Sequence, residues 1–475
     1  MMATGSDRLT HDERRALVRG TLYRIVGTPV VAVLGLANTA VIAHETGSAV
    51  FGLVSLVATI TLLVPFADLG IGATVLSAGS RLQDNGDDPG AADVIRRAYR
   101  VLFAVAGATV AVALIVMALD GWTVLVGISS GPADRWAITV AACLFAFTIP
   151  AGLGLRILIG IGRIPSATVI QMSCPAAALV ITLTLYAIRA DEIWYAVSAL
   201  GGLLAGQILG TVLALRASGL GWSAFARVSA SNTGTRLLAG SGWLFVVGVG
   251  TAVGLQTGRV LLAHLSTPAD LSEYAVMAQI YGVVWSVIST AGLAYWPVFV
   301  KRQGAAEGTI RMWWRLTAVF AVGAAGATIG LTLLGPWAAD VLSGGQIDVP
   351  AMLALAFGLL LVAQAVHFPA SVLLVIPGEA RWQALWTVVM AAIGVGLGCM
   401  LAGPFGAVGV VCAAALGVYL AQVLPDLLWV PRLVRRRMTD GADRAGWQVG
   451  PRRSYREARR ESRSRSHPQL PRRAG

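Results

Sequence analysis

The sequence has few charged residues, and this scarcity limits the classes of protein it can form. Asp, Glu, Lys and Arg make up only 13% of the 475 residues, whereas hydrophobic residues make up 56%. A water-soluble fold needs a charged surface, so this composition excludes one and indicates a lipid bilayer as the solvent. The apolar residues fall in runs of roughly 18 or more, which cross about 30 Å of hydrocarbon as helices.

Short segments of alternating polarity, which a transmembrane β-barrel requires, are also missing. The stretches 101–119 and 351–363 are apolar on nearly every face. The sequence therefore predicts an all-α, polytopic membrane protein with about twelve transmembrane helices. The expected spans are 22–43, 50–76, 99–119, 136–156, 165–188, 193–215, 238–263, 272–299, 315–334, 350–376, 382–402 and 406–430.

Patterns that mark an enzyme, a metal site or a cofactor site are lacking as well. The four cysteines lie singly within apolar runs, without metal-ligand spacing. No Gly-rich loop precedes a Lys-Ser or Lys-Thr pair, although glycine is abundant. The predicted outer loops are too short to carry the catalytic residues of a polysaccharide polymerase or ligase, so we expect neither an enzyme nor a cofactor.

The positive charge is strongly uneven along the chain, and its placement predicts the topology. The formal net charge is +12, and much of it lies in the Arg-rich tail 431–475. Short cytoplasmic loops retain Arg during insertion, and nearly all the remaining Arg fall in alternate loops. Both termini are therefore expected in the cytoplasm of a multi-pass cell-membrane protein. The tail, poor in apolar residues, is expected to be disordered and not a nucleic-acid site.

The two halves of the chain repeat weakly. A shift of 220 residues aligns Gly20 with Gly240 and Ala43-His44 with Ala263-His264. A repeat of six helices predicts two lobes in the same orientation around a central cavity. The expected parts are an N-terminal segment 1–21, an N-lobe 22–215, a linker 216–237, a C-lobe 238–430 and the tail 431–475.

Several short motifs resemble those of a known transporter family. Phe51-Gly52 opens the second expected span and Asp68-Leu69-Gly70 closes it, while Gly160-Ile161-Gly162-Arg163 joins two later spans and 405–409 opens the last. These stretches resemble bacterial polysaccharide exporters, within the multidrug/oligosaccharidyl-lipid/polysaccharide flippase superfamily.

That resemblance implies a substrate and partners. The substrate would be a lipid-linked oligosaccharide, carried on undecaprenyl pyrophosphate and moved from the inner to the outer leaflet by alternating access. Membrane lipids, glycosyltransferases and a polysaccharide polymerase would be the partners. The alternative is an ion-coupled multidrug extruder of the same superfamily, with H⁺ or Na⁺ as the coupling ion. Extruders commonly keep acidic residues inside their helices, whereas here only Asp68 and Asp426 come close to membrane depth.

Arg259 is the first candidate for substrate binding. It falls well inside an expected span, where a buried cation costs about 2.5–3.5 kcal/mol. One interpretation is that its planar fork binds a pyrophosphate in the cavity. The other is that the side chain snorkels to the outer interface.

Two further polar residues, Arg24 and Asp68, receive alternative interpretations. Arg24, near the inner end of the first span, is a second cavity candidate or an ordinary positive-inside anchor. Asp68 holds a cytoplasmic gate by pairing with Arg81 or Arg24, or it is a plain helix-end residue. His367 is expected to be a core histidine.

Overall fold

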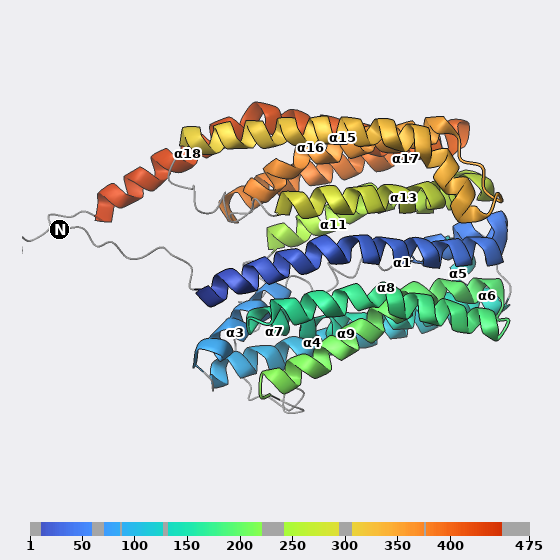
Figure 1. Ribbon diagram of the computed structural model, residues 1–475, viewed down its shortest axis with the longest axis horizontal. Coiled ribbons are helices and arrows are strands. Elements are labelled where there is room, and N and C mark those ends of the chain that lie inside the picture. Colours follow the sequence, from blue (N-terminus) through green and yellow to red (C-terminus); the bar gives the residue numbers. More distant parts are fainter. Residues whose placement is uncertain are drawn as a thin grey trace, which may run out of the picture.

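The computed structural model describes residues 11–58, 71–85, 88–126, 132–220, 242–293, 306–374 and 377–448, and all its elements there are helices. They form two bundles, with helix α1 running along the boundary between them (Figure 1). The predicted all-α membrane fold with two lobes is confirmed.

The first bundle comprises the elements up to residue 217. They are α1 (His11–Ala58), α3 (Ile71–Asn85), α4 (Pro89–Ala118), α5 (Trp122–Val126), α6 (Pro132–Ala151), α7 (Leu153–Gly160), α8 (Ile164–Ala187), the 3-10 helix η2 (Glu192–Ala196) and α9 (Val197–Ala217). Its core is built mainly from α3, α4, α7 and α9, where apolar side chains interlock away from α1.

The second bundle follows the same plan. It contains α11 (Gly242–Gln256), α12 (Gly258–Leu265), α13 (Pro268–Leu293), α15 (Ala306–Ser343), α16 (Ala351–Leu373), α17 (Pro377–Val418), the π-helical turn η4 (Tyr419–Val423) and α18 (Leu424–Gln448). A larger apolar core joins this bundle to α1 and α6 of the first bundle.

Ten described helical stretches are long and apolar enough to cross a membrane. The stretch Arg381–Arg436 contains both of the last two expected spans, and the second expected span, 50–76, lies only partly within the described residues. Large apolar side chains such as Val322, Leu333 and Met400 are exposed on the outside of the bundles. An apolar exterior of this kind suits contact with lipid.

Two glycines divide helices that otherwise run on continuously. Gly47 in α1 has a φ of 63° and Gly406 in α17 has a φ of 53°. A positive φ strains any residue with a Cβ, so glycine is the natural residue where the chain turns from one span into the next. These two positions separate spans one from two and eleven from twelve, as the expected boundaries require.

Some boundaries differ from the sequence prediction. Helix α4 begins at Pro89 and not at residue 99, because the carboxylate of Asp88 caps it by accepting the N–H groups of Gly90 and Ala91 at 2.9 and 3.1 Å. Helix α18 continues to Gln448, so the tail expected to be disordered from residue 431 starts as helix, which corrects that boundary. Residues 449–475 lie outside the described part.

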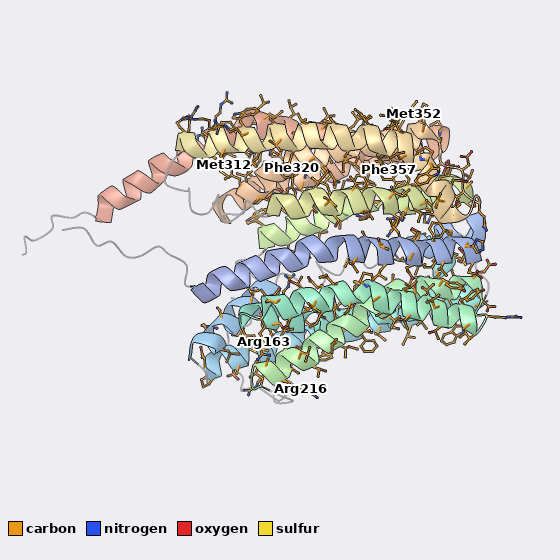
Figure 2. The ribbon with its side chains drawn as sticks, in the orientation of Figure 1. Arg163, Arg216, Met312, Phe320, Met352 and Phe357 are labelled. Atoms are coloured by element: carbon orange, nitrogen blue, oxygen red, sulfur yellow. The ribbon has the colours of Figure 1, made fainter. Side chains whose placement is uncertain are left out.

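The labelled residues of Figure 2 show in which direction the helices run. Arg163 and Arg216 of the first bundle lie at the same end of the molecule as Met312 of the second, whereas Met352 lies at the opposite end (Figure 2). Arg163 and Arg216 belong to loops expected in the cytoplasm, so the helices run in the directions that the predicted topology requires.

Candidate functional site

The two bundles touch each other through hydrogen bonds at the end predicted to be outside the cell. The N–H of Gly52 in α1 donates to Oγ of Ser272 in α13 at 3.1 Å, and Gln346 Nε2 donates to the carbonyl of His44 at 3.3 Å. Gly52 lies near the start of the second expected span of the first half, and Ser272 begins the second expected span of the second half. The starts of corresponding spans therefore meet where the bundles close.

His264 adds a third contact at this end. Its Nε2 lies 3.0 Å from the carbonyl oxygen of Val124 in the first bundle, and its Nδ1 lies 2.9 Å from the carbonyl of Val260. His44 and His264, aligned by the repeat, thus both take part in contacts between bundles, His44 through its carbonyl. The closed end is formed by matching parts of the two halves.

Next to this closed end lies a cavity of about 310 Å³ between the bundles. Helices α1, α8 and α9 form most of its wall and α13 of the second bundle contributes the rest. Its described lining consists of Gly35, Asn38, Thr39, Ile42, Phe51, Val54, Ser55, Ala58, Cys174, Pro175, Ala178, Ala199, Leu203, Ala275 and Gln279.

The polar groups of the cavity wall are amides and hydroxyls. Thr182 of α8 donates to Oδ1 of Asn38 at 2.7 Å, which fixes that amide with its NH₂ group as the remaining donor. Gln279 reaches the cavity from α13 and approaches Gly35 of α1. Described residues of the wall include no charged side chain, so any strong contact with an anion must come from its edge.

Arg259 lies at that edge. It is buried, with 8% of its surface exposed, and it follows the break at Thr257 that separates α11 from α12. Its Nε donates to Oγ of Ser55 at 3.1 Å, across the boundary between bundles, and Ser55 itself lines the cavity. The side chain therefore points between the bundles and not toward lipid.

Two further contacts hold the Arg259 guanidinium in place. One Nη donates to Gln256 Oε1 at 3.4 Å, and Cζ lies 5.4 Å from the centre of the Tyr274 ring. A cation over an aromatic face gains electrostatic stabilisation that increases when water is excluded. No described residue forms a hydrogen bond with the second Nη of Arg259, so this part of the guanidinium can still donate to a ligand.

The other expected site residues are placed differently. Arg81 of α3 is exposed and lies 4.0 Å from Asp88 in the turn before α4, so its ion pair is local. Asp68 and the side chain of Arg24 lie outside the described part of the chain. Pairing of Asp68 with Arg81 or Arg24 in a gate therefore stays a prediction.

Sequence reasoning missed the contact partners of the candidate residues. Ser55, Tyr274 and Gln279 are ordinary polar or aromatic residues in apolar runs, and nothing in their spacing links them to Arg259 or to one another. The structure also joins His367 to Asp426 at 2.6 Å. The available signal was the occurrence of ionisable residues at membrane depth, which marks functional sites in transporters.

The sequence matches the model of a known protein family. The model of a family described as polysaccharide biosynthesis protein matches residues 17–303, more than half of the chain. No curated protein sequence matches the chain.

Solved structures with the same fold are found in spite of low identity. An inward-facing multidrug resistance transporter of the MATE family and MOP superfamily gives a TM-score of 0.67 at 13% identity, covering 88% of this chain and 99% of that one. The lipid II flippase MurJ in an inward closed conformation gives 0.62 at 11% identity, covering 88% and 90%. A MOP superfamily transporter from Pyrococcus furiosus, whose structure is described as showing a reversed polarity of the binding pocket, gives 0.58 at 13%, covering 89% and 95%. At such identities the likeness shows the fold alone.

Proposed function

Because the chain belongs to the polysaccharide biosynthesis protein family, we propose that it flips a lipid-linked oligosaccharide from the inner to the outer leaflet by alternating access. The substrate would carry its glycan on a polyprenyl pyrophosphate. Family and fold are those of a multi-pass membrane transporter and not of an enzyme, in agreement with the sequence analysis.

The position of Arg259 carries this proposal. A pyrophosphate is an anion with several planar acceptor groups, and a guanidinium binds such groups through two parallel hydrogen bonds. Arg259 is buried between the bundles, beside the cavity and held by partners from both halves. This position supports the proposal, because a substrate that passed between the lobes would come close to the charge.

The cavity wall suits the glycan part of the proposed substrate. Sugar hydroxyls act as both donors and acceptors, and the amides of Asn38 and Gln279 offer both kinds of partner. Phe51 and the aliphatic wall residues provide apolar surface beside them. A neutral polar wall with a cation at its edge fits a glycan attached to an anionic carrier.

The arrangement of the bundles supports alternating access. Three hydrogen bonds join the bundles at one end, beside the apolar core that α1 and α6 share with the second bundle. Both sets of contacts separate if the bundles rotate apart. Each of these contacts is a single hydrogen bond, worth about 0.5–1.5 kcal/mol net, so the hydrogen bonds add little to the cost of opening this end.

The test is complementation of a flippase-deficient strain, scored by surface polysaccharide and by the membrane level of each variant. We expect Arg259→Ala to abolish export at normal membrane levels, and Arg259→Lys to impair it because an ammonium cannot reproduce the bidentate contact. Arg135→Ala is the matched control, since Arg135 forms a half-exposed ion pair with Asp120 at 3.0 Å at the same end and such pairs contribute little.

One outcome of this experiment would contradict the proposed role of Arg259. Full export by a well-inserted Arg259→Ala variant would remove the residue from substrate binding. It would leave the ion-coupled multidrug extruder, the alternative raised by the sequence and by the fold of the MATE transporter, on an equal footing.

A further inference from the structure

A buried pair of ionisable side chains lies in the second bundle, away from Arg259 and the cavity. Nδ1 of His367 in α16 is 2.6 Å from Oδ2 of Asp426 in α18, and their side chains are 16% and 4% exposed. Both residues belong to stretches apolar enough to span a membrane. Ionisable groups at such depth are expensive, and they persist where they pair and serve a function.

The charge of this pair depends on one proton. With the proton bound, the pair is either imidazolium with carboxylate or imidazole with carboxylic acid, and its net charge is zero. Without the proton, a carboxylate remains beside a neutral imidazole, with a net charge of −1. A buried net charge is strongly disfavoured unless water reaches it. Release of the proton is therefore linked to separation of α16 from α18.

The backbone next to Asp426 is built to allow such a separation. The π-helical turn Tyr419–Val423 ends immediately before α18, and Pro425 removes a further backbone donor beside Asp426. π-turns and prolines are recognised causes of bends in helices, because both interrupt the regular hydrogen-bond ladder. The interruption lies within one turn of Asp426.

We propose that the His367–Asp426 pair is a proton-binding site, and that its occupancy controls the packing of α18 against α16 and through it the position of the second bundle. The bound state is the packed arrangement seen here. Loss of the proton favours a hydrated arrangement in which α18 bends at η4. The cation bound at this site is thus a proton, held by a histidine and a carboxylate, and not a metal ion held by an oxygen cage.

The neighbouring polar groups agree with this assignment. Tyr281 of α13 donates to Oε1 of Gln364 at 2.7 Å, one turn from His367 on α16, so a polar contact with α13 lies beside the pair. Described charged or titratable side chains on the helices packed around the pair include Tyr281 of α13, Glu307, Arg311 and Arg315 of α15, Arg381 of α17, Tyr419 of η4, and Arg432, Arg435 and Arg436 of α18. Of these, Arg435 pairs with Glu307 at 3.0 Å and Arg381 lies over the Trp243 ring.

The test measures conformation and needs no substrate, so it is independent of the flippase proposal. Spin labels on Ser166→Cys in the first bundle and Arg311→Cys in the second, in protein free of other cysteines, report the distance between the bundles in lipid nanodiscs. Both positions are exposed. We expect the distance distribution of the otherwise native protein to change between about pH 5 and pH 8, the range in which histidine-centred sites commonly titrate.

Two variants decide whether this pair is responsible. Asp426→Asn mimics the protonated acid, so it should keep the low-pH distribution at every pH. His367→Gln still donates a hydrogen bond but cannot be protonated, so it should displace the midpoint of the transition. Thr328→Val is the control, because it removes a buried hydrogen bond from α15 to the Gly358 carbonyl of α16 at 2.9 Å without removing a titratable group.

The proposal is overturned if the native distribution does not respond to pH. It is also overturned if both pair variants keep the native profile, or if Thr328→Val flattens the profile as Asp426→Asn does. Retention of the transition in Thr328→Val, together with its loss in Asp426→Asn, supports the proposal.

Discussion

Arg259 is held by three different kinds of contact, and each comes from another part of the fold. Ser55 belongs to the first bundle, Gln256 to the end of α11 and Tyr274 to α13. Gly258 makes this possible, because a Cβ there would lie 2.9 Å from the Tyr274 hydroxyl. Removing water from around a cation and an aromatic ring strengthens their attraction, so Tyr274 is the partner whose loss should be felt most.

Substitutions of Tyr274 test this residue-scale interpretation. Tyr274→Phe keeps the ring face and should unfold at nearly the native temperature, whereas Tyr274→Leu should lose about 0.5–2 kcal/mol from the missing cation–π contact. The measurement is thermal unfolding of the purified protein. Repeating it in an Arg259→Ala background isolates the interaction, and an unchanged cost of Tyr274→Leu there would show that the ring stabilises something other than Arg259.

Pairs of helices approach closely where glycines replace larger residues. A Cβ on Gly154 of α7 would lie 2.3 Å from the Cα of Thr211 in α9, and one on Gly202 of α9 would lie 2.4 Å from the backbone nitrogen of Ala178 in α8. Without a hydrophobic driving force between helices in lipid, small residues allow the close packing that holds a bundle together. Close contacts between helices thus explain why glycine occupies these two positions.

Adding one methyl group at such a contact should destabilise the first bundle. Gly154→Ala should lower stability by about 1–3 kcal/mol, because the backbone of α9 must move to make room. Gly326→Ala in α15 is the matched control, since a Cβ there meets nothing within 4 Å. Thermal unfolding compares the two. Equal unfolding temperatures would mean that α7 and α9 are not packed as closely as described.

The whole molecule is organised by its repeat and by its charge. The starts of corresponding spans of the two halves meet at Gly52 and Ser272, and Arg163 and Arg216, of loops expected in the cytoplasm, lie at the other end (Figure 2). Cytoplasmic loops retain positive charge. The closed end of the structure is therefore expected to face the outside of the cell and the cavity to be reached from the cytoplasm.

Cysteine labelling in intact cells tests this orientation. In protein free of native cysteines, Ala269→Cys at the closed end should react with a membrane-impermeant maleimide, whereas Ser166→Cys should react only after the cells are opened. Both positions are exposed, and neither change alters a charge. Labelling of Ser166→Cys in intact cells would reverse the assigned orientation of the chain.

The expected spans agree with most of the helices, because the formation of each membrane-spanning helix depends only on the residues within it. Apolar runs of sufficient length form helices in lipid wherever they occur, since no other element satisfies its backbone there. The glycines that divide α1 and α17 are equally local. Helix α4 starts ten residues before the expected span at residue 99, because the Asp88 cap and the polar first turns of the helix lie outside the apolar run.

What the sequence by itself determined is the solvent, the number of spans and the two-fold plan, since these depend on hydropathy and spacing along the chain. The tertiary structure decided which ionisable residues act together. Arg259 reaches Ser55 across 204 positions and His367 reaches Asp426 across 59. Such partners are chosen by the packing of whole helices, whose rotation about their own axes no local pattern fixes when nearly every face is apolar. The desolvation cost of each charge then depends on that packing, and so does its function.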